Sequence, residues 1–128
     1  MLHLFARLLE TQGDIKKLTK EEKNLAKDAK NYMDRMYSRD IRIQDVAGIL
    51  HVHPNYLSTL FRREYDQSPR EYLRKVRMNQ AKILLTTTEY SISDISSDVG
   101  YTNPFQFSKV FKSCYGISPT EYRNMRQV

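Results

Sequence analysis

The sequence lacks several features on which large classes of protein depend. Its 128 residues include a single cysteine, Cys114, so the chain can form neither an internal disulfide nor a cysteine cage for a metal, which favours the reducing cytoplasm. No apolar run approaches the roughly 18 residues that a membrane span needs. The first nine residues lack the long apolar core and cleavage site of a signal peptide. We therefore expect a cytoplasmic protein that does not enter a membrane.

Glycine and proline are also scarce, at four residues each, and no useful length of chain alternates apolar and polar residues as a half-buried strand does. These absences predict an all-α fold. A chain of this length forms one compact domain, or two small cores that share an element. Tryptophan is absent, but nine Tyr and five Phe can anchor such cores. The 21 Lys and Arg against 15 Asp and Glu, a net charge of +6, suit a polyanion such as nucleic acid or an anionic membrane surface.

The N-terminal part divides into a tail and the start of a packed domain. Residues 1–18 are predicted to be a linker or the tail of an absent effector-binding or dimerisation domain. They begin with a short amphipathic turn or helix, whose stripe of Leu2, Phe5 and Leu9 fits either a dimer seam or packing against that domain. Thr19-Lys20-Glu21-Glu22 then forms a capping box, which predicts a helix from there to about residue 38. Its apolar stripe is expected at Leu25, Ala29, Tyr32, Met33 and Met36.

From Ile43 onward the sequence repeats itself. Ile43-x-x-Val46-Ala47-x-x-Leu50 recurs 49 positions later as Ile92-x-x-Ile95-Ser96-x-x-Val99. One extra residue then enters the second copy, and eight identities follow at an offset of 50. The first-copy members of these identical pairs are Pro54, Ser58, Phe61, Tyr65, Ser68, Pro69, Glu71 and Tyr72. Such a match indicates two copies of one supersecondary element.

Each copy has the outline of a helix-turn-helix unit, at about 41–67 and about 91–116. A short amphipathic helix leads through a turn to Pro54 or Pro104, at the first position of a second helix. The second helices are expected to bury Leu57, Leu60 and Phe61 in one copy, and Phe107, Val110 and Phe111 in the other. Their polar faces are basic and rich in amides, and can bond base edges and phosphates in a major groove. A merely solvated face is the alternative. The candidates for phosphate contacts are His53, Arg62, Arg63, Asn103 and Lys112.

A long helix is predicted to connect the two units, over about 69–86. Ser68-Pro69-Arg70-Glu71 is a capping box, and its counterpart Ser118-Pro119-Thr120-Glu121 starts a C-terminal helix at about 119–126. The expected stripe of the connector is Leu73, Val76, Ala81 and Leu84, widened by Met78 and Leu85. About 18 helical residues span roughly 27 Å, near the roughly 34 Å between successive major grooves, so the second helices of the two units can face the same side of a duplex. If the connector is rigid and its span falls short of a turn, the DNA has to bend.

Residues 19–128 resemble the DNA-binding domain of the AraC/XylS family of bacterial transcription regulators. The motifs that carry the resemblance are Arg77-Met78-x-x-Ala81-x-x-Leu84-Leu85, Ile92-x-x-Ile95-x-x-x-Val99-Gly100-Tyr101, Phe107-Ser108-x-x-Phe111-Lys112 and Gly116-Ile117-Ser118-Pro119-x-x-Tyr122-Arg123. The resemblance implies a homeodomain-like fold of seven helices, with two helix-turn-helix subdomains joined by one long helix. It also implies binding to double-stranded operator DNA, usually with activation of transcription through RNA polymerase.

The resemblance further assigns base contacts to six residues of this chain. They are Asn55, Ser58 and Thr59 in the first unit, and Phe105, Gln106 and Lys109 in the second. Two departures stand out. Arg42 occupies a position where the family often has a Ser or Thr helix cap, which is expected to loosen the start of the first unit. Ser58 and Thr59 are shorter than the Arg or Gln often found there, so the first unit is expected to read bases modestly. A small-molecule effector is expected to act only through a domain absent from these residues, although the family also contains short stand-alone activators.

Other chemistry finds little support in the sequence. His3, His51 and His53 lack metal-site spacing, Cys114 has no partners for nucleophilic catalysis, and no phosphate-cradling Gly loop is present. Asp45 and Asp94 are interpreted as caps in the first turns of helices. We therefore predict a DNA-binding transcription regulator that is not an enzyme and uses no cofactor or metal. The alternative is a helical module that docks RNA polymerase or another regulator and binds DNA only weakly.

Overall fold

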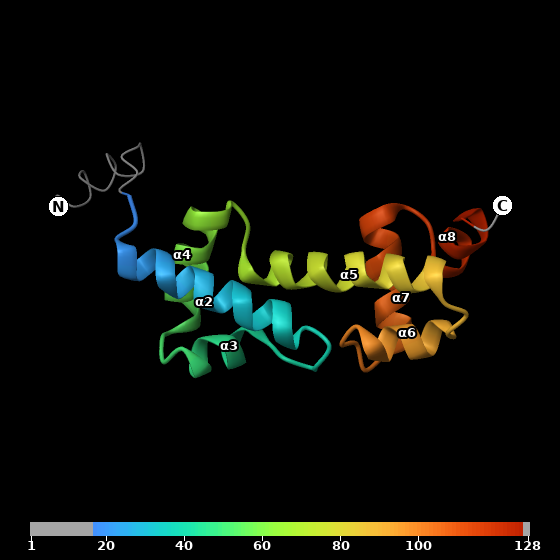
Figure 1. Ribbon diagram of the computed structural model, residues 1–128, viewed down its shortest axis with the longest axis horizontal. Coiled ribbons are helices and arrows are strands. Elements are labelled where there is room, and N and C mark those ends of the chain that lie inside the picture. Colours follow the sequence, from blue (N-terminus) through green and yellow to red (C-terminus); the bar gives the residue numbers. More distant parts are fainter. Residues whose placement is uncertain (1–16, 127–128) are drawn as a thin grey trace.

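The computed structural model describes residues 17–126, and every regular element within that range is a helix (Figure 1). The helices are α2 (Lys20–Met36), α3 (Ile43–Ile49), α4 (Pro54–Tyr65), α5 (Pro69–Thr87), α6 (Ile92–Asp98), α7 (Pro104–Tyr115) and α8 (Pro119–Arg126). The predicted all-α fold class is confirmed. In this described part, no helix is long and apolar enough to cross a membrane. The turn or helix expected near the N-terminus lies outside it.

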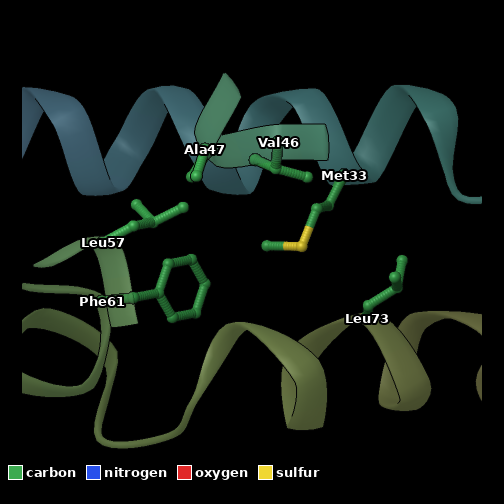
Figure 2. Packing of buried hydrophobic residues seen from close by; sticks show 7 residues of the cluster. Met33, Val46, Ala47, Leu57, Phe61 and Leu73 are labelled. Carbon is green, nitrogen blue, oxygen red and sulfur yellow. The ribbon is translucent and has the colours of Figure 1, made fainter. Parts of the chain in front are cut away.

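Two helical units lie at the two ends of α5 (Figure 1). The first unit comprises α2, α3, α4 and the beginning of α5, and the second comprises the end of α5 with α6, α7 and α8. Each unit has its own core, and the two cores share no buried residue. The first core contains Ala29, Met33, Val46, Ala47, Leu57, Phe61 and Leu73 (Figure 2). The second core contains Met78, Ala81, Leu85, Ile95, Val99, Phe107 and Phe111.

The two cores are built around the same aromatic arrangement. In each unit, one fully buried Phe of the second helix packs against two half-buried tyrosines. The ring centroids of Phe61 lie 4.7 Å from Tyr65 and 5.7 Å from Tyr72, and those of Phe111 lie 4.7 Å from Tyr115 and 5.6 Å from Tyr122. Tilted and edge-on pairs at these distances are favourable beyond the area that they bury. The sequence repeat is therefore a repeat of packing.

Capping boxes show that the repeat begins earlier than the sequence analysis placed it. Thr19, Ser68 and Ser118 each accept the N–H of a glutamate three residues on, at 3.1 Å, and that glutamate accepts the N–H of the cap residue at 2.8–2.9 Å. The three boxes are spaced by 49 and 50 positions, the offsets of the helix-turn-helix copies. Each copy thus includes the helix that precedes it. In consequence α5 is both the last helix of the first unit and the first helix of the second.

The apolar stripe predicted for α2 is partly wrong. Ala29 and Met33 are buried as expected, but the third buried residue is Ala26, whereas Leu25 is only half-buried. The expected stripe members Tyr32 and Met36 are also half-buried. The buried face of α2 thus holds Ala26, Ala29 and Met33, and the larger apolar side chains beside it are only half-buried.

The connector departs from its predicted stripe as well. Leu73 is buried in the first core and Met78, Ala81 and Leu85 in the second, so the buried face of α5 changes along its length. For this reason Val76 and Leu84, expected at the centre of one stripe, are only half-buried. In α7, Phe107 and Phe111 are buried as predicted while Val110 is half-buried. The most consequential difference is Arg77, which is 8% exposed in the middle of α5.

Helix α3 begins with half of a capping box. Its cap residue Arg42 has no side-chain acceptor, and only the Asp45 carboxylate contributes, accepting the Arg42 N–H at 2.8 Å. In α6, the equivalent cap Ser91 accepts the N–H of Asp94 at 3.0 Å. Asp45 is therefore a cap, as predicted, and the hydroxyl half of the box is missing in the first unit.

Candidate nucleic-acid interface

The second helix of each helix-turn-helix unit, called here the recognition helix, is α4 in the first unit and α7 in the second. Helix α4 starts at Pro54, whose missing N–H is no loss at a first helical position. The preceding His53 is exposed and caps the helix, because its ring Nδ1 accepts the Asn55 N–H at 3.1 Å. With Nδ1 accepting this bond, the neutral ring carries its proton on Nε2. His53 therefore presents an exposed N–H donor beside the start of α4, as a phosphate contact requires.

Helix α7 starts in the same way, with a stronger cap. The side-chain oxygen of Asn103 accepts the N–H of Phe105 at 2.8 Å and that of Gln106 at 3.3 Å, and Pro104 occupies the first helical position. This leaves the amide nitrogen of Asn103 as the donor that the exposed side chain can offer to a phosphate. Both recognition helices end in a left-handed residue, Asp66 or Gly116.

The outward face of α4 carries the residues predicted from the sequence. Asn55, Thr59, Arg62 and Arg63 are exposed and Ser58 is half-buried. The last four residues of this face line an open hollow of about 270 Å³. Thr59 already donates its hydroxyl proton to the Asn55 carbonyl at 3.0 Å, so towards a ligand it offers an acceptor oxygen and a methyl group.

The outward face of α7 is equally open. Phe105 is 83% exposed, and Gln106, Lys109 and Lys112 are exposed beside it. Within residues 17–126, Lys109 forms neither a hydrogen bond nor an ion pair with another side chain. So exposed an aromatic ring at the first turn of a helix has no part in the core. The structure thus brings together the three residues predicted to contact bases in the second unit.

The two faces share one polarity in equivalent settings. From Pro54 to Tyr72, burial matches that of Pro104 to Tyr122 at every aligned position but one. The hydrogen bond from the cap backbone is the main cause of the lowered pKa of the capping carboxyls Glu71 and Glu121. The positive charge of Arg62 or of its equivalent Lys112 makes a smaller contribution in the same direction. Figure 1 shows α4 and α7 at opposite ends of α5, each running across its long axis.

Other chemistry is not assembled among the described residues. No group of three or more His, Cys, Asp or Glu side chains in residues 17–126 is placed to hold a metal ion. Cys114 is a free, exposed thiol. One residue that bears on the interface was named in a motif but given no role in the sequence analysis: Arg77, buried next to the turn that leads into α7. The available signal was an arginine adjoining the apolar stripe of the connector.

Sequence comparison places the chain among transcription regulators. Residues 46–125 match the model of a family described as a helix-turn-helix domain. The lactose operon transcription activator of Staphylococcus xylosus is 40% identical over 96 residues, which cover 75% of this chain and 34% of that protein. The chain spans 34–41% of the length of the first curated relatives that it matches.

Solved structures share the fold over most of the chain. The C-terminal domain of AraT, a response regulator from Geobacillus stearothermophilus, is 34% identical with a TM-score of 0.79, covering 88% of this chain and 91% of that one. The DNA-binding domain of AdpA, a global transcriptional factor solved in complex with a target DNA, has a TM-score of 0.75 and covers 80% of this chain and 92% of its own. At 20% identity, that second likeness shows the fold alone.

Proposed function

Because the chain belongs to the AraC/XylS family of helix-turn-helix transcription regulators, we propose that it binds operator DNA with α4 and α7 in two successive major grooves. One observation carries this proposal: two recognition helices in matching settings each leave an exposed, donor-rich face without acidic residues, at opposite ends of one helix. A fold of the same kind is bound to target DNA in the AdpA structure. The protein acts in the cytoplasm, where bacterial DNA is found.

In the second unit, three side chains supply direct base contacts. Gln106 can bond the N6 and N7 atoms of adenine, Lys109 can donate to O6 and N7 of guanine, and the Phe105 ring can contact a thymine methyl group. In the first unit, Asn55 is suited to adenine, while Ser58 and Thr59 reach less far. Sequence preference is therefore expected to be stronger at the half-site that α7 reads.

Basic and amide side chains at the edges of these faces hold the phosphates and carry no sequence information. In this role we place His53, Arg62, Arg63, Asn103 and Lys112. The 19 residues of α5 span roughly 28 Å, which is less than the roughly 34 Å between successive major grooves. The bound DNA is therefore expected to curve towards the protein.

Salt dependence separates this function from its alternative. Fluorescence anisotropy with mixed duplex DNA across a salt series should show a steep linear fall of log affinity against log salt, because each neutralised phosphate releases counterions. A flat response would favour a helical module that docks another protein and binds DNA weakly. Selection from a random duplex pool then supplies the preferred site.

Lys109 tests the division between base and phosphate contacts. Lys109→Ala should weaken binding to the selected site by roughly 5- to 150-fold, as expected for a lost base contact worth about 1–3 kcal/mol, and weaken binding to random duplex much less. Lys112→Ala is the matched control on the same helix: it should weaken both alike and lower the salt slope by about one. Equal losses for Lys109→Ala on the two DNAs would assign it to a phosphate.

We further propose that the regulated promoters are activated and that RNA polymerase is the partner. The printed name of the S. xylosus relative, a transcription activator, supports this direction. Any small-molecule effector acts through a domain other than the one described. Runoff transcription with purified polymerase on a promoter carrying the selected site should rise when the protein is added, and a fall would identify a repressor.

A further inference from the structure

Arg77 lies at the boundary between the two units. Its neighbours along α5 are Leu73 in the first core and Met78 in the second, and the side chain is 8% exposed. Burial lowers the pKa of the guanidinium, because removal from water penalises the charged form. A buried cation must be compensated by hydrogen bonds, so the partners of Arg77 show what holds it there.

Those partners come from both units. In the first unit, Nε donates to the Tyr37 carbonyl at 2.9 Å and Nη2 donates to the Arg39 carbonyl at 2.8 Å, both just after α2. In the second unit, the guanidinium lies 5.4 Å from the ring centroid of Tyr101, in the turn that leads into α7. Two hydrogen bonds and a cation–π contact thus join the end of α2 to the start of the second recognition helix.

Gly100 brings the same turn against the first unit directly. Its φ is +99°, a conformation that favours glycine. A Cβ atom at this position would lie 2.3 Å from the Tyr37 carbonyl oxygen and 2.8 Å from Nε of Arg77. Only a residue without a side chain allows the backbone of the second unit to approach this closely. The two units are therefore joined at two places, through α5 and through this contact.

A second arginine offers an internal comparison. Arg123 of α8 donates from Nε to the Leu85 carbonyl at 3.0 Å and from Nη2 to the Thr88 carbonyl at 3.2 Å. Thr88 stands 49 positions after Arg39, the offset of the repeat, so both arginines cap the end of the first helix of a unit. The hydrogen bonds just described for Arg123 lie inside the second unit. Arg77, by contrast, donates to carbonyl groups of the first unit and also contacts the Tyr101 ring of the second.

We propose that Arg77, seated against Gly100, is the positioning residue that fixes the relative placement of α4 and α7, and so determines which spacing between two half-sites the protein accepts. This inference rests on the proposed binding to two grooves. A single helix between two units can bend and twist, but a second attachment point restricts both motions. Adding or removing one base pair between the half-sites rotates one half-site by about 34–36° relative to the other. Two units that can rotate relative to each other can follow this change, whereas two units held in one fixed orientation cannot.

The binding test uses duplexes that carry both selected half-sites at the preferred spacing, or with one base pair added or removed. The wild-type protein should bind the altered duplexes at least tenfold more weakly. Arg77→Met keeps the aliphatic stem but removes the hydrogen bonds and the cation–π contact that join the units. The affinities of this variant for the three duplexes should therefore differ from one another by no more than about threefold. Arg123→Met, the matched control, should keep the wild-type ratio. A tenfold ratio retained by Arg77→Met, or a wild-type protein indifferent to spacing, overturns the proposal.

Arg77→Lys is the second variant, for use should the methionine variant lose its helical circular dichroism. Lysine keeps the charge but has a single donor nitrogen, so Arg77→Lys should weaken the preference for one spacing, though less than Arg77→Met does. A wild-type affinity ratio between the duplexes for Arg77→Lys would also contradict the proposal. Failure of the proposed function looks different: the wild-type protein would then bind the two-part duplex no better than one half-site alone.

A distance measurement tests the joint without DNA. Spin labels at Glu64→Cys in α4 and Ser113→Cys in α7, both exposed positions, in a Cys114→Ser background report the distance between the recognition helices by double electron–electron resonance. Arg77→Met should broaden the distance distribution, and Arg123→Met should leave it unchanged. A distribution as narrow as that of the parent in Arg77→Met overturns the inference whatever the DNA result.

Discussion

Replacing Arg42 with serine should stabilise the first unit. The cap residue of α3 has extended backbone angles (φ −120°, ψ 162°), in the same broad region as those of Ser91 at the start of α6 (φ −66°, ψ 159°). In α6 the serine hydroxyl accepts the N–H three residues on at 3.0 Å. The same bond from residue 42 would complete the box that Asp45 already half forms. Such a cap contributes about 1 kcal/mol, which corresponds to a rise in Tm of about 3–6 °C for a domain of this size.

Thermal unfolding followed by circular dichroism at 222 nm measures this gain. Because the substitution also removes a positive charge from a basic protein, Arg42→Ala is the control: it removes the charge without providing an acceptor. The capping argument requires Arg42→Ser to unfold at a higher temperature than Arg42→Ala. If the two variants unfold together, the hydroxyl does not form the bond and the reasoning is refuted.

Two further predictions concern the cores and the caps. Phe61→Ala and Phe111→Ala should each lower the free energy of unfolding by about 3–5 kcal/mol. The two losses, measured by urea unfolding, should agree within about 1 kcal/mol because each ring is fully buried against two tyrosines. A difference of several kcal/mol between them would contradict equivalent packing. Cap hydrogen bonds lower the pKa of Glu22, Glu71 and Glu121 from 4.5, so the stability that they contribute is complete above that pH and is lost as the pH falls through the lower folded-state values. Changing all three to Gln, which keeps an acceptor, should make Tm fall less steeply with pH below pH 4.5. If the dependence of Tm on pH were unchanged, protonation of the capping glutamates would be excluded as the cause of the fall.

Local signals explain how much of the fold could be predicted from sequence. Proline at a first helical position and a hydroxyl three residues before a glutamate both act through orphan N–H groups of the first turn, so they mark helix starts without reference to tertiary structure. The outward faces of α4 and α7 were also predictable. An amphipathic helix that packs with one side leaves the other exposed, and the predicted contact residues of α4 and α7 are exposed except Ser58, which is half-buried.

What sequence could not supply is the packing of helices that contact more than one partner. In α5 the buried side passes from the first core to the second, so no single stripe describes it. Ala26 is buried and Leu25 is only half-buried, so the buried face of α2 is displaced from the stripe that its large apolar residues predict. Arg77 was read as part of a motif only, since its burial depends on carbonyl groups about 40 positions away in the chain.

Hydroxyl-radical footprinting on a selected operator tests the central claim most directly. Two recognition helices in successive major grooves should protect two patches of backbone on one face of the duplex, about 10 base pairs apart. Lys109→Ala should weaken the protection attributed to α7 more than that attributed to α4. A single protected patch, or two patches on opposite faces of the duplex, would contradict an account in which both units read DNA together.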